Sequence, residues 1–159
     1  MTAPQPVRIQ WYYRIPPPVW MLALFLDAYC IQNSFAWGAR VYVRSLPLAI
    51  VFAVAGLALA VWGERTFHAA GTEVIPASAT NKKVVTTGPF RFTRNPMYAG
   101  LVLIALGIAV YAGTLPFFAV PVLLFLLCNS VFIPFEEAKM QRQHGALYTD
   151  YLHHVRRWI

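Results

Sequence analysis

Four stretches of nearly uninterrupted apolar residues divide the chain: Val19 to Ala39, Leu46 to Gly63, Met97 to Gly113 and Phe117 to Phe135. A helix needs about 20 mostly apolar residues to cross a bilayer. The pattern therefore predicts four membrane-spanning helices. Only the short stretch "AGTLP" separates the third run from the fourth, which predicts that these two helices form a tight antiparallel hairpin.

The first apolar run is the least lipid-like, because it contains Asp27, Gln32 and Asn33. An acidic residue inside a membrane-spanning helix is a functional hypothesis by default. Asp27 could also form a structural hydrogen bond, with Asn129, Ser130 or Gln32 as partners. Both interpretations stay open at this point.

Two more polar segments complete the pattern. A long link, Glu64 to Pro96, joins the second and third runs, and the tail Glu136 to Ile159 follows the fourth. A long loop inside a compact domain is usually functional or disordered. Apolar and aromatic positions recur in the tail at helical spacing, which predicts one amphipathic helix. These positions are Met140, His144, Leu147, Tyr148, Tyr151, Leu152 and Val155.

Composition supports an integral membrane protein. The 159 residues are 58% hydrophobic and 12% charged, with a mean hydropathy of +0.53, whereas soluble domains are about 25% charged. A small domain has too much surface for its volume to bury that many apolar side chains, so the surplus must face lipid. The net charge of +7 comes from Lys and Arg beside the apolar runs, which suits anionic lipid headgroups and not nucleic acid.

The positive residues also predict an orientation. Four spans place both termini and the long link on one side, and the side richer in Lys and Arg faces the cytosol. The opposite side has only Arg40 and Arg44. The predicted cytosolic side holds Arg8, Arg14, Arg65, Lys82, Lys83, Arg91, Arg94, Lys139, Arg142, Arg156 and Arg157.

Two motifs stand out at the cytosolic end of the predicted hairpin. The entry motif "GPFRFTRNPMYAG", Gly88 to Gly100, leads into the third run, and the acid pair Glu136 and Glu137 follows the fourth. Because the two helices are hairpin neighbours, the entry motif and the acid pair must lie close together. Adjacent carboxylates repel each other and are costly to desolvate, so we expect a nearby cation. Arg91, Arg94 or a cationic ligand could provide it.

The motifs together resemble a known family. The entry motif, then a hairpin, then "EEAKM" and finally "GALYTDYLHHVRRWI" resemble the carboxyl-terminal core of the isoprenylcysteine carboxyl methyltransferases. The wider group includes phospholipid N-methyltransferases and small bacterial enzymes. The resemblance extends from about Val74 to Ile159, and the order of the motifs makes it specific.

The resemblance implies an S-adenosylmethionine-dependent methyltransferase in a membrane, here the bacterial inner membrane. It places the cofactor between the third-run entry, the acid pair and the tail helix. Glu136 and Asn95 are the implied catalytic residues, although an Asn cannot act as an acid or base near neutral pH. The implied cofactor-binding residues are Arg91, Asn95, Pro96, Tyr98, Gly100, Glu136, Glu137, Tyr148 and Tyr151.

The chain departs from the family where substrate specificity is concerned. The animal carboxyl methyltransferases have an arginine about one helical turn before the acid pair, and Phe132 stands there in this chain. A carboxylate substrate would lose that partner, so a lipophilic amine, thiol or other nucleophile is expected. Asp27 and Phe132 are the candidate substrate-binding residues. Membrane lipids are the other expected partner, and the oligomeric state is left open.

Simpler interpretations compete with these roles. Arg91 and Arg94 are typical of positively charged membrane anchors, and the acid pair could be a solvated helix end. Tyr148 and Tyr151 fit the aromatic belt of a membrane interface. Clusters of His, Cys and acidic residues with metal-ligand spacing are lacking, which predicts that no metal is bound.

Two other functions fit part of the pattern. Sterol reductases share a similar Arg-x-Pro-x-Tyr entry and a tyrosine-rich tail, but they use NADPH and are much longer. A non-catalytic membrane module is the third possibility. Chain length and the acid pair favour methyl transfer, so we predict an all-α membrane bundle forming one domain, 1–159. Its parts are two amino-terminal spans (1–63), a cytosolic loop (64–96), the hairpin (97–135) and a cofactor-covering helix (136–159).

Overall fold

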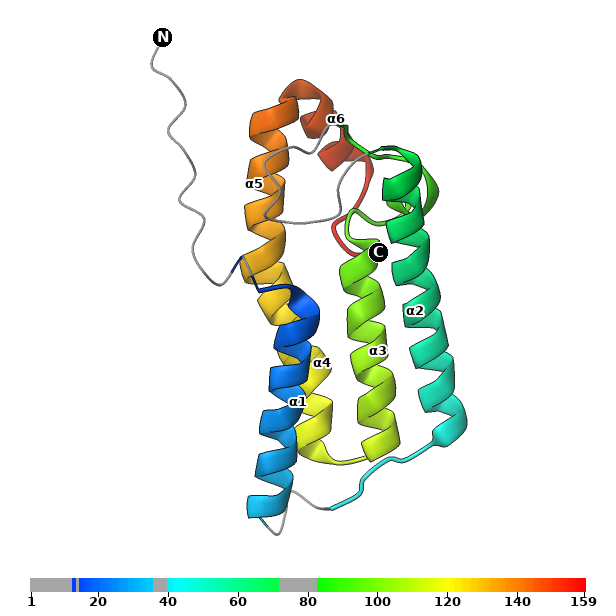
Figure 1. Ribbon diagram of the computed structural model, residues 1–159, viewed down its shortest axis with the longest axis vertical. Coiled ribbons are helices and arrows are strands. Elements are labelled where there is room, and N and C mark those ends of the chain that lie inside the picture. The colour runs from blue at the N-terminus through cyan, green and yellow to red at the C-terminus, as the bar shows by residue number, and fades with distance from the viewer. Residues whose placement is uncertain (1–12, 14, 36–39, 72–82) are drawn as a thin grey trace.

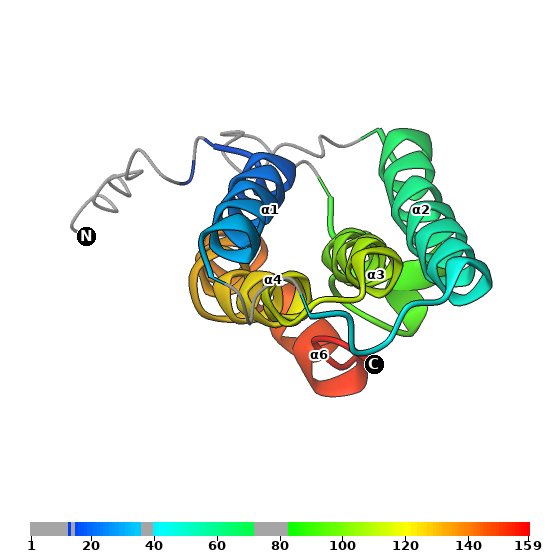
Figure 2. The same ribbon diagram turned by 90° about the horizontal axis from the view of Figure 1, so that it is seen from below.

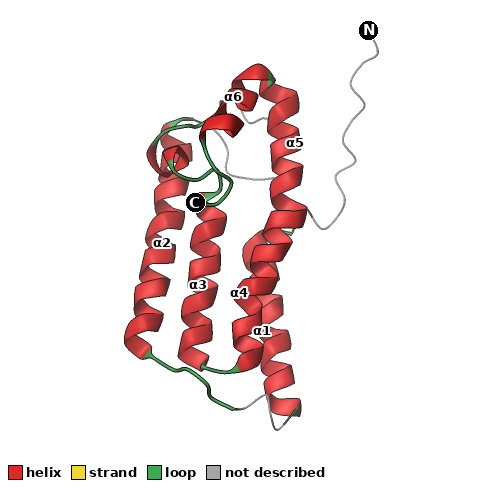
Figure 3. Cartoon of the chain, turned by 180° about the vertical axis from the view of Figure 1, so that it is seen from behind, coloured by secondary structure: helices red, strands yellow, loops and turns green. Residues whose placement is uncertain are grey.

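The chain folds into a bundle of helices (Figure 1). A computed structural model describes residue 13 and residues 15–35, 40–71 and 83–159, and every named element within these residues is helical (Figure 3). This agrees with the all-α prediction. The elements are α1 (Pro17–Ser34), α2 (Leu46–Ala69), the 3₁₀ turn η2 (Gly88–Arg91), α3 (Pro96–Ala112), α4 (Leu115–Leu127), the π turn η3 (Cys128–Phe132), α5 (Ile133–His144) and α6 (Ala146–His154).

The four long helices run alongside one another in a curved row. Viewed from one end, the order across the row is α2, α3, α4 and α1 (Figure 2). The helices α5 and α6 extend beyond α4 and cover one end of the bundle (Figure 1). The main core lies between α1, α3 and the α4–α5 helix, where Met21, Ala105, Leu124 and Cys128 are buried. Helix α2 contacts the rest of the row through α3.

Helices α2 and α3 approach each other closely because small residues face each other. A Cβ placed on Gly56 would lie 2.5 Å from the carbonyl oxygen of Gly100, and a Cβ on Gly100 would lie 2.5 Å from the carbonyl oxygen of Gly56. One level further along, a Cβ on Gly107 would lie 2.8 Å from the carbonyl oxygen of Ala49. Small residues allow this backbone approach, which is a common way to pack helices in membranes.

The fourth apolar run is part of a longer helix. Helix α4, the π turn and α5 form one continuous rod from Leu115 to His144, which extends well beyond the predicted end at Phe135. In the π turn the Ile133 N–H donates to the Cys128 carbonyl oxygen, one residue further back than in an α-helix. Pro134 follows at once and has no N–H to donate, so regular α-helical bonding is interrupted here in any case.

The prediction of a single amphipathic helix over Glu136–Ile159 is wrong. Helix α5 ends at His144, α6 covers Ala146–His154, and the chain from Val155 onward is not helical. The break lies at Gly145, whose φ of +51° is in a region that residues with a Cβ avoid. The tail therefore turns back across the end of the bundle instead of continuing outward.

The other element boundaries differ less from the prediction. Helix α1 begins with prolines after Pro16, and proline suits the first turn of a helix. Helix α1 ends at Ser34 and the following Phe35 is extended, so the helix is shorter than the predicted run to Ala39. Ala39 itself and residues 72–82 of the predicted link, Val74 included, lie outside the described residues. Helix α2 continues to Ala69, past the predicted end at Gly63. Helix α3 begins at Pro96 and ends before Gly113, as expected from the apolar run.

Among the described residues, two helices are long and apolar enough to cross a membrane: α2 and the continuous helix Leu115–His144. Helix α3 is apolar but has 17 residues. Large apolar side chains are exposed along the outer faces of several helices, for example Leu22 and Leu26 of α1, Val51 of α2 and Leu126 of α4. Soluble monomers rarely expose apolar surface on this scale, so this surface suits lipid.

Candidate functional site

A cavity of about 670 Å³ lies at the end of the bundle that α5 and α6 cover. Its walls come from the start of α1, the second half of α2, the turn η2, the start of α3, and the helices α5 and α6. Small-molecule sites usually have volumes of about 300–1,000 Å³. The cavity is therefore large enough for a ligand of cofactor size.

The wall of the cavity has an apolar part and a charged part. Helices α2 and α3 contribute apolar side chains, among them Leu57, Val61 and Leu101. The entry motif, α5 and α6 contribute polar side chains. These are Arg94, Asn95, Tyr98, Glu136, Glu137, Lys139, Tyr148 and Tyr151.

A hydrogen bond between Tyr98 and Glu136 joins the entry motif to the acid pair. The Tyr98 hydroxyl donates to Glu136 Oε1 at 2.6 Å. Tyr98 lies in the first turn of α3 and is buried, while Glu136 lies in the first turn of α5 and is partly buried. The hairpin thus brings the entry motif and the acid pair together, as the sequence predicts.

Glu137 has a different environment from its neighbour, because two arginines bind it. Arg94 Nη2 lies 3.2 Å from Glu137 Oε1. Arg157 donates to both carboxylate oxygens, from Nε to Oε1 at 3.1 Å and from Nη2 to Oε2 at 2.5 Å. A bidentate arginine–carboxylate pair is among the stronger ion pairs in proteins. The cation expected beside the acid pair is therefore present, and it is Arg94 together with Arg157.

Arg94 connects three elements and keeps one donor unused. Its Nη1 donates to the Leu152 carbonyl oxygen of α6 at 3.1 Å, in addition to the ion pair with Glu137. Its side chain is 13% exposed. The buried Nε has no hydrogen-bond partner among the described residues. A buried unsatisfied donor is costly, so this atom suits an acceptor group on a ligand.

Asn95 lies at the start of α3 and contacts the end of the chain. Its Nδ2 donates to the Arg157 carbonyl oxygen at 3.0 Å, and its backbone N–H donates to Thr93 Oγ1 at 3.2 Å. Asn95 also lines the cavity. Pro96 follows as the first residue of α3 and is buried beside the cavity lining.

Tyr148 and Tyr151 close the cavity from α6. Both are buried in a small second core with Phe90 and Val85. The Tyr151 hydroxyl donates to the Phe90 carbonyl oxygen at 2.7 Å, which ties α6 to η2. Burial raises the pKa of both phenols above their ordinary value, so both remain protonated and can act as hydrogen-bond donors.

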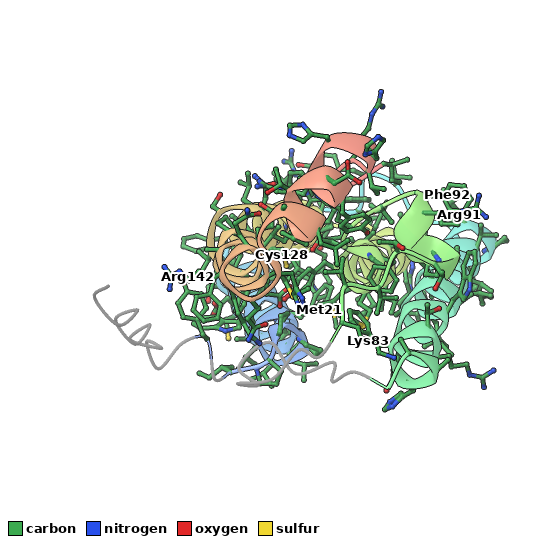
Figure 4. All side chains as sticks on the ribbon, turned by 90° about the horizontal axis from the view of Figure 1, so that it is seen from above. Met21, Lys83, Arg91, Phe92, Cys128 and Arg142 are labelled. Atoms are coloured by element: carbon green, nitrogen blue, oxygen red, sulfur yellow. The ribbon has the colours of Figure 1, made fainter. Side chains whose placement is uncertain are left out.

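Five of the sequence-predicted residues are not part of the cavity lining, and Pro96, described above, is one of them. Arg91 is exposed at the outer edge of the molecule (Figure 4). Gly100 packs against Gly56 of α2. Asp27 is exposed on α1. Phe132 is 1% exposed in the main core, where its ring lies edge-on to that of Tyr13.

Sequence reasoning missed the role of the last residues. Besides binding Glu137, Arg157 donates from Nη1 to Asn129 Oδ1 at 3.3 Å, and Trp158 Nε1 donates to the same oxygen at 3.0 Å. The only signal is the sequence "RRWI" after an amphipathic segment, and it is equally typical of a membrane anchor. Within the described residues, no group of three or more His, Cys, Asp or Glu side chains is placed to hold a metal ion.

Comparison with known proteins yields one match. A family model described as phospholipid methyltransferase matches residues 44–146, which is well over half of the chain. The matched region includes α2, the entry motif, α3 and the continuous helix that contains the acid pair. Neither a search of curated proteins nor a search of solved structures found a match.

Proposed function

The chain belongs to the phospholipid methyltransferase family, as the resemblance in its sequence predicts, and from that premise we propose that it methylates a lipophilic small molecule or lipid with S-adenosylmethionine. The observation that carries the proposal is the Tyr98–Glu136 hydrogen bond at the wall of a 670 Å³ cavity. It unites the two motifs that the family shares, on a surface that a ligand can reach.

The residues present fit this cofactor. The cavity has an adequate volume, and its polar part offers both a spare cationic donor, Arg94 Nε, and a carboxylate, Glu136. In the proposed arrangement Arg94 holds the carboxylate of the cofactor and Glu136 faces its positive charge. Tyr98 and Tyr148 supply further polar contacts from α3 and α6.

When bound, S-adenosylmethionine supplies a methyl group on a positively charged sulfur. The protein's task is then to align a nucleophile and keep water away, and no covalent intermediate with the protein is needed. Leu57, Val61 and Leu101 form the apolar wall that excludes water. Glu136 Oε1 is held by Tyr98, which leaves Oε2 to accept a proton from the nucleophile, whereas Asn95 contributes a neutral hydrogen bond.

The same proposal includes the membrane arrangement. Helices α1, α2, α3 and the rod Leu115–His144 are taken as four spans, supported by their side-by-side packing and their exposed apolar faces. The distribution of Lys and Arg supports placing the cavity end and both termini on the cytosolic side of a bacterial inner membrane. The cofactor then enters from the cytosol and the lipophilic substrate from the bilayer.

The nature of the nucleophile follows from what the site lacks. Phe132 stands where the animal carboxyl methyltransferases have an arginine, and it is buried in the core. An amine or thiol is therefore a better substrate for this chain than a carboxylate. Asp27 is exposed on α1, so a role in substrate binding would require the substrate to reach it along the outer face of that helix.

A binding titration tests the proposal. Purified protein in detergent is titrated with S-adenosylmethionine, S-adenosylhomocysteine and NADPH by calorimetry. We expect the first two to bind and NADPH not to bind. Binding of NADPH alone would instead support a reductase, and binding of none of the three would support a non-catalytic module.

Two variants locate the site in the same titration. Glu136→Ala removes the carboxylate that faces the cofactor, and we expect at least about tenfold weaker binding, which corresponds to about 1.4 kcal/mol. Arg40→Ala changes an exposed residue near the opposite end of the bundle and should leave the affinity unchanged. Wild-type affinity in Glu136→Ala would refute the site as proposed.

A further inference from the structure

The last residues of the chain form a strap across the cavity end of the bundle. We use the name C-terminal strap for Arg156, Arg157 and Trp158, which follow α6 and are not helical. The strap lies against the loop before α3, against α5 and against the π turn. Its contacts divide into those of the backbone and those of the side chains.

The backbone of the strap fixes the loop that precedes α3. The Arg94 N–H donates to the Arg156 carbonyl oxygen at 2.9 Å. The Arg157 carbonyl oxygen accepts two more hydrogen bonds, from Thr93 Oγ1 at 3.2 Å and from Asn95 Nδ2 at 3.0 Å. These contacts do not depend on which side chain stands at position 157.

The side chains of the strap hold α5 and the π turn. The Arg157 guanidinium binds both oxygens of Glu137 and also Asn129 Oδ1. Trp158 donates to the same Asn129 oxygen, and its ring lies 4.6 Å from that of Phe125. Glu137 is only 17% exposed, and a carboxylate with so little exposure is costly to bury unless it is paired.

We propose that Arg157 is a positioning residue that binds Glu137 and keeps it in place. Arg94 then stays available to the ligand, and Glu136 is the carboxylate of the acid pair that takes part in the reaction. This inference rests on the proposed function. Glu137 has two cationic partners, and the stronger, bidentate one is Arg157. If Arg157 were absent, Arg94 would be the cationic partner left to Glu137. Glu137 would then compete with the ligand for Arg94 Nε, the buried nitrogen that has no partner among the described residues.

The arrangement also explains how two adjacent carboxylates can share one partly buried site. Like charges on neighbouring side chains disfavour ionisation of both groups. Arg94 and Arg157 together offset the charge of Glu137 and leave Glu136 to the Tyr98 hydroxyl. Removing Arg157 leaves Arg94 to offset the charge of Glu137, so Glu136 then lies beside a less compensated charge while its own contact with Tyr98 is unchanged.

Binding of S-adenosylhomocysteine to four variants tests the inference. We expect Arg157→Ala to weaken binding at least about tenfold, and Arg157→Lys, which keeps the charge but not the bidentate geometry, to weaken it less. Glu137→Gln removes the competing charge, so the double variant Arg157→Ala/Glu137→Gln should bind more tightly than Arg157→Ala alone. Arg142→Ala removes an equal charge from the exposed, outward face of α5 and should bind like the wild type (Figure 4).

The double variant separates positioning from general support of the fold. If Arg157 only supported the fold, removing the charge of Glu137 as well would not restore binding. Equal binding by wild type and Arg157→Ala would overturn the inference, and so would a double variant that binds as weakly as Arg157→Ala. If Arg157→Ala does not yield folded protein, the Lys variant and the double variant give the same comparison. Lack of binding by the wild type would refute the proposed function instead.

Discussion

The two sides of α3 are built on opposite principles. Toward α2 the helix presents glycines, and the two backbones almost touch at Gly56 and Gly100. Toward α5 it presents Tyr98, whose long side chain reaches Glu136 beside a cavity. The contact with α2 is close because glycines have no side chain, whereas the contact with α5 is a hydrogen bond between two side chains. A rigid contact behind the helix thus holds the side chains that face the ligand.

The difference is sharp because Tyr98 and Gly100 are only two residues apart in the first turns of α3. A larger side chain on the side of α3 that faces α2 has to displace the backbone of α2. A smaller side chain in place of Tyr98 opens space beside the cavity and removes the hydrogen bond to Glu136. Substitutions on the two sides should therefore fail in different ways. The first kind should lose the fold, and the second should lose binding in a folded protein.

The largest effect is expected from Gly100→Leu. A Cβ at this position would lie 2.5 Å from the Gly56 carbonyl oxygen and 2.9 Å from the Ala60 nitrogen, so α2 and α3 would have to separate. Backbone cannot relax as a flexible side chain can. We expect most of the folded protein to be lost, measured as the monodisperse peak in size-exclusion chromatography after detergent extraction.

Ala55→Leu is the matched control, because it adds the same side chain to the exposed face of α2. Its yield should equal that of the wild type. If Gly100→Leu gives a wild-type peak as well, close approach of the two backbones is not what holds α2 in place.

An intermediate effect is expected from Tyr98→Phe. The ring still packs in the core near Phe132, so the protein should fold. The hydroxyl that holds Glu136 is lost, and hydrogen bonds to charged groups are worth about 1.5–3 kcal/mol. We expect binding of S-adenosylmethionine to weaken by about tenfold or more, measured by calorimetry.

Tyr29→Phe serves as the control, because Tyr29 is 57% exposed on α1. It loses a hydroxyl of the same kind without changing the cavity. Loss of folded protein in Tyr98→Phe, rather than loss of affinity, would show that both sides of α3 are structural.

The smallest effect is expected from Tyr151→Phe on the wall formed by α6. The substitution leaves the Phe90 carbonyl oxygen without the donor that lies 2.7 Å away. A neutral hydrogen bond contributes about 1 kcal/mol. We expect a slightly lower thermal midpoint and nearly unchanged affinity; a large loss of affinity would mean that the hydroxyl itself serves the ligand.

The hairpin was predictable because its signals are local. Two apolar runs with a short connection must be neighbours, and a motif at each outer end must then meet. That the entry motif and the acid pair are neighbours follows from that topology, whereas the hydrogen bond between Tyr98 and Glu136 comes from the structure. The α2–α3 contact was not predicted, since its small residues lie in separate apolar runs and become meaningful only when the helices are aligned.

The rest of the site depends on contacts that no local pattern contains. Gly145 ends α5 inside a segment whose apolar spacing continues as in one helix. Because of that break, Arg157 returns to Glu137, 20 residues earlier in the sequence. Arg91 and Arg94 look equivalent in the entry motif, yet only Arg94 faces inward. Arg91 is the last residue of the 3₁₀ turn η2 and is exposed, whereas Arg94 lies three residues later in the loop before α3 and contacts the acid pair.

The π turn from Cys128 to Phe132 has a consequence for comparing this chain with its relatives. Successive side chains of an α-helix are rotated by about 100° around the helix axis. One extra residue in a turn therefore changes the direction in which all later side chains point. A relative with one residue fewer in that turn would aim the aligned acid pair in another direction. Identical letters in an alignment column after the turn indicate the same site only where both chains have the extra residue.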